Sequence, residues 1–117
     1  RGLLSAHPRA MTEKRDRLAL LEGMIAQGNR DPFVRYARAM ELRSQKRLDE
    51  ALAAFRELVE QDPDYVPTYL MAAQVAAELG QRDLACELIE AGIPRARAAG
   101  DSRAVGELSQ LLEEIRA

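Results

Sequence analysis

Only a few side chains in this sequence could take part in catalysis. The one histidine, His7, has Ser5 nearby, and nucleophilic catalysis needs a nucleophile, a base and a group that orients the base. No third group accompanies this pair, so Ser5 and His7 do not make a triad. The sequence therefore predicts that the chain is not an enzyme.

Residue types that bind metals are present but do not converge. Cys86 is the only cysteine and lies beside Ala85 on a predicted helix, where it is expected to be a small core or boundary residue. Asp62 and Asp64 flank Pro63, which indicates a turn, because a calcium loop needs more ligands and a glycine at its sharp bend. The glutamates at helical spacing are assigned to solvated faces, and they are Glu57, Glu60, Glu87 and Glu90. Since there is no glycine-rich phosphate loop either, the sequence predicts no metal and no cofactor.

The composition argues against several kinds of partner. The 117 residues carry a formal net charge of −2, which is too near neutral to indicate a nucleic-acid or membrane surface. The basic run at Lys14, Arg15 and Arg17 is interrupted by Asp16 and is too short for a nucleic-acid patch. No apolar run reaches the ~18–20 residues that a membrane span requires, and no segment resembles a signal peptide. A single cysteine rules out an internal disulfide, which is compatible with the cytoplasmic location that we expect.

Two helices joined by a tight turn form the centre of the chain, in residues 47–80. In the first, apolar residues recur at i, i+3, i+4 and i+7, as on one face of an α-helix. These residues are Leu48, Ala51, Leu52, Phe55, Leu58 and Val59. The second, residues 65–79, carries one charged side chain, Glu78, so it must be covered on more than one side. We therefore expect it in the middle of the molecule, between helices that precede and follow it.

The pattern repeats along the chain at a fixed interval, which we call the repeat period. The matched positions are Ala39 and Ala73, Leu42 and Ala76, Lys46 and Gly80, Ala51 and Ala85, and Phe55 and Ile89. Small residues recur where helices must approach closely, and a large apolar residue follows the second alanine by four. A period of about 34 residues filled by two antiparallel helices is typical of a tetratricopeptide array. Over residues 31–100 the chain resembles the tetratricopeptide repeat (TPR) family, which implies an all-α fold, a short right-handed TPR superhelix of helical hairpins.

The rest of the chain is arranged around these hairpins. Residues 1–10 show no helical period and precede Met11, which resembles a translation start, so we interpret them as a vector-derived segment or an upstream extension. Residues 11–117 are then expected to form a single TPR domain. Its parts are an N-terminal half-repeat at 12–28, repeats at 31–64 and 65–100, and a C-terminal capping helix at 101–117. Thr12 is expected to cap the first helix, and Pro94 to kink or break the helix that contains it.

Two arginines depart from the family pattern. Arg35 and Arg38 stand where TPR helices usually have a large aromatic residue and a leucine. Such a change is expected if no complete repeat lies upstream, because the arginine stems can then lie along a partly covered face with their charged groups in water.

The resemblance also implies a binding groove on the inner face of the array. In TPR proteins the first helix of each hairpin lines a concave groove that accepts a peptide or a helix. In this chain the lining residues would be Phe33, Tyr36, Met40, Arg43, Leu70 and Gln74. Most of them are apolar, so the lysine and asparagine clamp with which some TPR domains hold a terminal carboxylate is not expected. Aromatic and methionine side chains are typical anchors for a protein or peptide partner.

Three interpretations of this surface stay open. The first is an adaptor or scaffold that binds a partner by burying the apolar groove residues. In the second, the groove is covered by the chain's own N-terminal segment or half-repeat, or by a neighbour's segment in a homo-oligomer, with Leu3 and Leu4 as anchors. In the third, the chain is a piece of a larger TPR enzyme or regulator. Two hairpins cannot complete a superhelical turn, so we expect a shallow groove.

Overall fold

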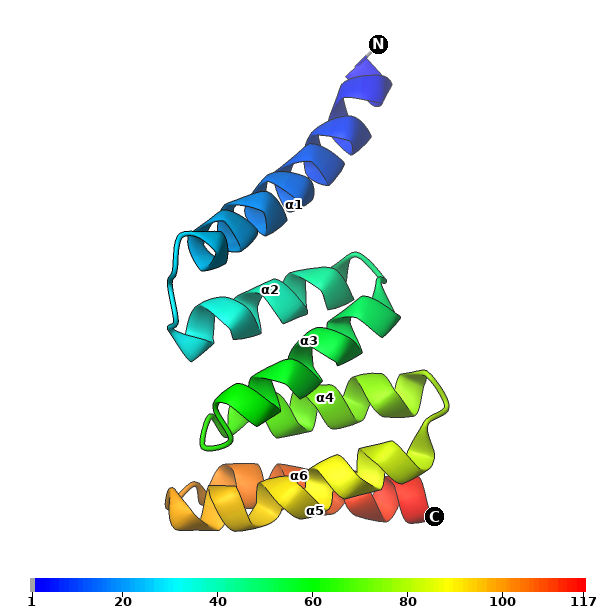
Figure 1. Cartoon of the computed structure of the whole chain (residues 1–117). Helices are drawn as coiled ribbons and strands as arrows, with labels where there is room; N and C mark the ends of the chain where they lie inside the picture. Colours follow the sequence, from blue (N-terminus) through cyan, green and yellow to red (C-terminus); the bar gives the residue numbers. More distant parts are fainter. Residues whose placement is uncertain (1) are drawn as a thin grey trace.

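A computed structural model shows a stack of helices (Figure 1). It describes the backbone of residues 2–117 and the side chains of residue 13 and residues 15–117. The helices in this part are α1 (Gly2–Ala26), α2 (Pro32–Ser44), α3 (Leu48–Gln61), α4 (Pro67–Glu78), α5 (Arg82–Ala98) and α6 (Ser102–Arg116). Residues 2–117 contain no strand, so the predicted all-α class is confirmed. None of the helices in the described part combines the length and the hydropathy that crossing a membrane requires.

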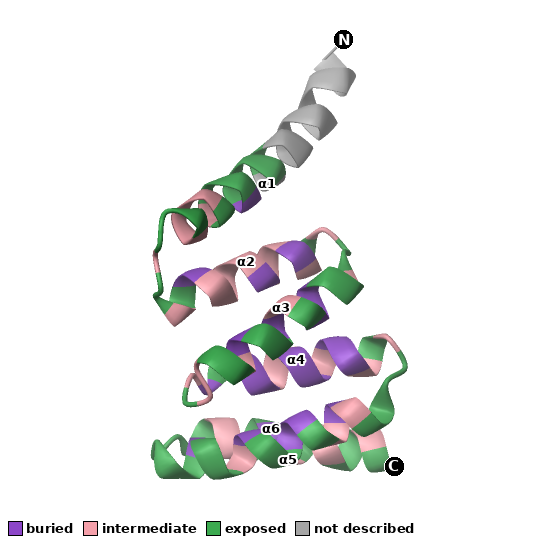
Figure 2. Ribbon diagram, in the orientation of Figure 1, coloured by how far each residue is buried: buried purple, intermediate pink, exposed green. Residues whose placement is uncertain are grey.

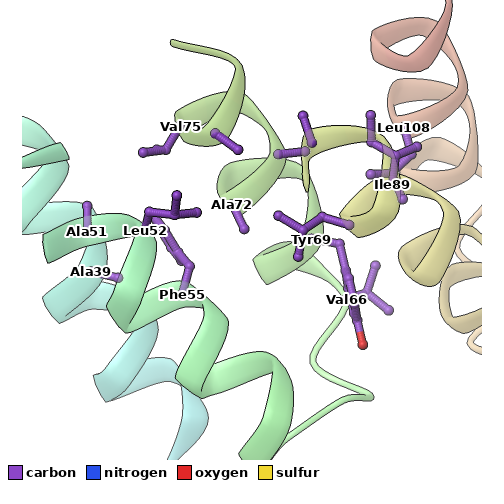
Figure 3. Close-up of a cluster of buried hydrophobic side chains, with 14 of the residues drawn as sticks. Ala39, Ala51, Leu52, Phe55, Val66, Tyr69, Ala72, Val75, Ile89 and Leu108 are labelled. Atoms are coloured by element: carbon purple, nitrogen blue, oxygen red, sulfur yellow. The ribbon is translucent and has the colours of Figure 1, made fainter. Parts of the chain in front are cut away.

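The helix α4 lies in the middle of the packed helices, as its lack of charge predicts. It contacts α3, α5 and α6, and half of its 12 residues are fully buried (Figure 2). Leu52 and Phe55 of α3 lie on one side of it, and Ile89 and Leu108 of the helices that follow lie on the other (Figure 3). Each helix therefore seals the apolar face of the helices next to it along the stack.

The positions matched by the repeat period form the centre of this core. The side chains are fully buried, at 0% exposure, at Ala39, Ala73, Leu42, Ala76, Ala51, Ala85, Phe55 and Ile89. Alanine at Ala39, Ala73, Ala51 and Ala85 lets the backbones of crossing helices approach closely, while Phe55 and Ile89 fill the space between hairpins. Ala39 and Ala73, one repeat period apart, are therefore equally buried.

The starts of α2 and α6 follow from capping residues that the sequence displays. Asp31 precedes Pro32 at the beginning of α2, and its Oδ1 accepts a hydrogen bond of 3.0 Å from the backbone N–H of Phe33. Asp101 does the same for α6, accepting from the N–H of Ala104 at 3.0 Å. These caps satisfy N–H groups that have no partner within the helix, so they fix the points at which α2 and α6 begin.

The expectation that the first helix begins at Thr12 is wrong. The helix α1 starts at Gly2 and runs without interruption to Ala26, so residues 2–10 are helical as well. Good helix formers such as Leu3, Leu4 and Ala10 precede the threonine, and a helix that already has turns before Thr12 does not need a cap there.

The expected break at Pro94 does not occur either, because α5 continues from Arg82 to Ala98 with the proline inside it. Pro94 and Glu90 are both exposed, so water can hydrogen-bond to the Glu90 carbonyl that the proline leaves without a donor. On the buried side of the same helix, Gly92 lies directly against the ring of Tyr69. Packing against α4 and α6 therefore holds the two halves of α5 in one helix.

Candidate functional site

A largely apolar groove lies between α1 and α2, and we call it the α1–α2 groove. Its volume is about 480 Å³, and its lining residues are Arg17, Leu20, Leu21, Phe33, Tyr36, Ala37, Met40 and Glu41. Leu20 is 66% exposed and Phe33 is 60% exposed, and they are the large apolar side chains that stand open to solvent among the described residues. The groove thus contains Phe33, Tyr36 and Met40 from the predicted binding surface.

The spacing of the α2 residues explains the apolar wall. Phe33, Tyr36, Ala37 and Met40 fall at i, i+3, i+4 and i+7, so they share one face of the helix. The opposite wall comes from α1, which supplies Leu20 and Leu21.

Tyr36 belongs to the groove and to the core at the same time. Its ring meets those of Phe55 and Tyr65 edge to face, with centroids 6.0 Å and 5.7 Å apart. Burial raises the pKa of the Tyr36 hydroxyl, the nearby Tyr65 raises it further, and Arg43 partly offsets both effects. Tyr36 therefore presents an uncharged aromatic surface to the groove near neutral pH, held in place from behind by two other rings.

The side chains of Arg43 on α2 and Gln74 on α4 contact each other. The Nη1 of Arg43 donates to Oε1 of Gln74 at 3.0 Å and to Sδ of Met71 at 3.4 Å, and its Nη2 donates to Oε1 of Glu78 at 2.7 Å. Arg43 also lines a separate hollow of about 330 Å³ that includes Met40 and Glu78. The two predicted polar site residues thus bind each other and join α2 to α4.

Leu70 lies apart from the other predicted site residues. It is half-buried on α4, where it packs against the core, and it lines neither the α1–α2 groove nor the hollow beside Arg43. The predicted surface is therefore divided into an apolar part between α1 and α2, a polar contact between α2 and α4, and Leu70.

Several lining residues were missed by sequence reasoning, and Glu41 is the most informative. Its Oε1 accepts from Nε of Arg17 at 3.0 Å, while its Oε2 is buried and has no hydrogen-bond partner among the described residues. A signal for Leu20 was available, because this leucine lies off the stripe of Leu18, Leu21 and Ile25, which recur at i, i+3 and i+7 on one face of the helix. No comparable signal marks Arg17 or Glu41, which resemble ordinary surface charges in the sequence.

The two departures from the family pattern, Arg35 and Arg38, lie on the other side of α2. Arg38 donates from Nε to Oε2 of Glu22 at 3.0 Å, and Arg35 donates from Nη1 to Oε1 of Gln61 at 3.4 Å. Their head groups are thus bound to α1 and α3 as well as hydrated, and they tie α2 to both neighbours.

Chemistry beyond binding has little support in the described residues. Their histidine, cysteine, aspartate and glutamate side chains form no group of three or more that could hold a metal ion. Cys86 is a free, half-buried thiol on α5. The side chains of Ser5 and His7 lie outside the described residues.

Comparison with known families and solved structures identifies proteins with a similar sequence and fold. A family model described as tetratricopeptide repeat matches residues 42–112. A TPR domain protein from Salinibacter ruber, solved by NMR, is 38% identical, with a TM-score of 0.70 over 74% of this chain and 87% of that one. No protein of curated function matches the sequence.

Two more distant structures share the fold and were solved with partners. The TPR2B domain of yeast Sti1 in complex with pHsp70 is 20% identical, with a TM-score of 0.81 over 92% of this chain and 86% of that one. PcrH in complex with the chaperone binding region of PopD is 15% identical, with a TM-score of 0.81 over 97% of this chain and 86% of that one.

Proposed function

The chain belongs to the tetratricopeptide repeat family, and from this membership we propose that it is a non-enzymatic protein-interaction module. It acts as an adaptor or scaffold that binds a peptide or a helix of a partner protein in the α1–α2 groove. Phe33, Tyr36 and Met40 supply the apolar contact, while Arg43 and Gln74, which are hydrogen-bonded to each other, orient polar groups of the partner. Leu70, which lies apart from the groove, packs against the core from α4.

The observation that carries this proposal is the exposure of Leu20 and Phe33 on opposite walls of one groove. A large apolar side chain in water is unremarkable when it stands alone. Two of them facing a shared apolar hollow form a contiguous patch, and such patches mark interaction sites in soluble proteins. Tyr36 and Met40 between them are residue types that anchor partners, because they bury large area and, for methionine, adapt in shape.

The distant structures support the same class of function. Sti1 TPR2B is in complex with pHsp70, and PcrH is in complex with a region of PopD, so this fold accommodates polypeptide partners. A polypeptide also suits this chain better than a nucleic acid or a membrane, because the net charge is −2. A cytoplasmic location fits the one free cysteine and is part of the proposal.

The test is a pull-down with immobilised protein and a lysate, comparing the wild type with the double variant Tyr36→Ala/Met40→Ala. We expect proteins retained by the wild type to be lost from the variant. A matched control is Leu84→Ala/Leu112→Ala, which removes apolar groups of similar size from half-buried sites outside the groove. Since Tyr36 also packs in the core, Phe33→Ser at an exposed site serves as a second variant that keeps the fold. Recovery of the same proteins by all variants would show that the groove is not the binding surface.

A homo-oligomer is the second candidate, and the exposed pair Leu20 and Phe33 favours it because apolar patches promote self-association. In this structure α1 is one helix from Gly2, so residues 2–10 do not turn back over α2 of the same chain. The segment of a neighbouring chain could still fill the groove through Leu3 and Leu4, whose side chains lie outside the described residues. Deleting residues 1–10 and measuring the mass of the particles by light scattering tests this candidate. It requires fewer chains per particle after the deletion.

A further inference from the structure

The first helix is less well covered than the two helices that repeat its position in the array. Leu21 of α1, Phe55 of α3 and Ile89 of α5 follow one another at one repeat period. Phe55 and Ile89 are 0% exposed, whereas Leu21 is half-buried and lines the α1–α2 groove. The preceding helix makes the difference, because Tyr36 of α2 packs on Phe55 and α4 packs on α5. In the described part of the chain, no helix takes the matching place beside α1.

The other wall of the groove, which belongs to α2, is also less well covered than its counterpart one repeat period later. Shifting Met40 and Glu41 of α2 by one repeat period gives Gln74 and Val75 of α4. Val75 is 0% exposed, and Gln74 accepts a hydrogen bond from Arg43 of α2. One period later, α4 also packs on α6. The α1–α2 groove thus corresponds to two other places in the molecule. One lies beside α3 and α4 and is filled by α2, and the other lies beside α5 and α6 and is filled by α4.

We infer that the α1–α2 groove receives one amphipathic α-helix of a partner protein, which lies on α1 and α2 as α2 lies on α3 and α4. We further infer that this helix carries an arginine or lysine that donates a hydrogen bond to Oε2 of Glu41. This inference rests on the proposed function and narrows the partner from any polypeptide to a helix with a cation beside its apolar face.

Glu41 supplies the argument for the positive charge. The Arg17 side chain that reaches its Oε1 is 54% exposed, while the Glu41 side chain is 15% exposed and its Oε2 is buried without a partner among the described residues. Buried carboxylate oxygens in folded proteins are nearly always hydrogen-bonded. The unpaired Oε2 therefore lacks a donor in the described part of the chain, and a docked cation supplies one when the Glu41 side chain turns toward the groove. Apolar side chains line the rest of the groove, so the charge sits at one edge of an otherwise apolar contact.

Arg43 shows how a helix in this position delivers a cation. From α2 it reaches Met71, Gln74 and Glu78 along one face of α4. The matching positions on α2 are Ala37, Met40 and Ser44, and Glu41 lies among them on the same face. An arginine placed on the docked helix as Arg43 is placed on α2 therefore comes within reach of Glu41.

A second copy of this chain joined head to tail does not fit as the occupant. The helix α6 would then have to lie on α1 with the face by which α2 packs on α3. On α2 that face contains Ala39 and Leu42, both fully buried, whereas the matching residues of α6 are Glu107 and Gln110, both exposed. Placing a glutamate and a glutamine against Leu21 would bury polar groups without partners. The chemistry of α6 therefore favours a different protein.

The experiment uses a fluorescein-labelled peptide with the sequence of residues 30–46, which copies α2 with both of its ends, added to the full chain. Fluorescence anisotropy measures its Kd, and a second peptide carries Ala39→Pro, which prevents the helix. We expect the first peptide to bind and the proline peptide to bind more weakly by about tenfold or more. A third peptide with Arg43→Gln tests the cation, and we expect it to bind about tenfold more weakly than the first.

Variants of the protein complete the test. Leu20→Asp, at a site that is 66% exposed, should weaken binding of the first peptide by more than about tenfold, while Ala53→Asp on the exposed face of α3 should leave it unchanged. Glu41→Gln should weaken the first peptide but have no effect on the Arg43→Gln peptide, because the two changes remove the same contact.

Four results would overturn the inference, and each is separable from failure of the proposed function. Equal binding of the helical and proline peptides would mean that the groove accepts extended chains, which leaves the interaction module intact. No binding of any peptide at about 1 mM, or equal effects of Glu41→Gln on both cationic and neutral peptides, would also overturn it. A dimer that Leu20→Asp dissociates, seen by sedimentation, would assign the groove to a second copy. The pull-down described above tests the interaction function independently of all four.

Discussion

Lys46 and Gly80, which lie one repeat period apart, have the same left-handed backbone conformation, with φ of 62° and 78°. Each follows a helix that ends in the same hydrogen-bond pattern. The N–H of Arg47 donates to the carbonyl of Leu42 at 3.0 Å, and the N–H of Gln81 donates to the carbonyl of Ala76 at 2.8 Å. The turn inside each hairpin is therefore held by the same local hydrogen-bond pattern, and Lys46 adopts the left-handed conformation although lysine has no preference for it.

This pair leads to a prediction on stability. Lys46→Gly should raise the free energy of unfolding by roughly 1 kcal/mol, because glycine occupies the left-handed region without the steric cost that a Cβ imposes. Gly80→Ala should lower it by a similar amount, although open space surrounds the added methyl group. Urea unfolding followed by circular dichroism measures both changes. Equal stability of Lys46→Gly and the wild type would show that the lysine conformation carries no strain.

A second prediction concerns the close contact between α4 and α5. A Cβ added to Gly92 would lie 2.6 Å from Cβ and 2.7 Å from Cγ of Tyr69, so Gly92→Ala forces the two helices apart. We expect a loss of about 1–3 kcal/mol in the free energy of unfolding. Gly106→Ala on α6 is the matched control, because nothing lies within 4 Å of its added Cβ. That variant should be more stable than the wild type by about 0.5–1 kcal/mol, since alanine favours the helix.

A third prediction separates the groove from the core. Leu42→Ala removes a side chain that is 0% exposed and should cost about 2–5 kcal/mol in unfolding free energy. Leu20→Ala removes the same group from a site that is 66% exposed and should change stability by less than about 0.5 kcal/mol. Chemical denaturation of the two variants gives both values. A cost for Leu20→Ala close to that of Leu42→Ala would mean that Leu20 is covered in solution, and that the groove is not open.

The tyrosines give a prediction on pH dependence. Burial raises the pKa of Tyr36, Tyr65 and Tyr69 above the ordinary value of 10.0. The nearby Asp31 adds to the effect at Tyr65. At Tyr69, Arg95 partly offsets the effect and Asp64 adds to it. The folded protein thus keeps phenol protons at pH values where the unfolded chain has lost them. Stability from this source is complete below pH 10.0 and declines as the pH rises through the raised pKa values.

Ultraviolet absorbance of tyrosinate measures this effect directly. The folded protein should titrate above the midpoint of the chain unfolded in guanidinium chloride, and Tyr36→Phe should remove one of the raised steps. Coincident titration curves for the folded and unfolded chain would contradict the burial of the three rings.

The fold could be predicted from the sequence because the residues that recur at the repeat period all pack between helices. Ala39 and Ala73 stay small where helices cross, and Phe55 and Ile89 fill the space between hairpins, so their spacing in the chain reports their contacts. Capping residues such as Asp31 act through neighbours in the chain, and these were also readable. Local and periodic signals therefore sufficed for the class, the family and most helix ends.

The remaining features depend on contacts that no spacing reports. The start of α1 was misplaced because Thr12 is equally compatible with a cap and with a helix interior. The break at Pro94 was overestimated because packing against α4 and α6 holds α5 together. Arg17 and Glu41 were missed as groove residues because their role depends on the space left beside α1, and a sequence does not show which neighbour a helix lacks.

The contrast between the two ends of the stack has a practical consequence for protein engineering. Further hairpins can be grafted ahead of α1, where Leu20 and Leu21 already provide an apolar surface for packing. Grafts behind α6 would first require Glu107 and Gln110 to be exchanged for small and aliphatic residues, as found at Ala39 and Leu42. A longer array built on this scaffold would thus grow in one direction by simple fusion and in the other only after resurfacing.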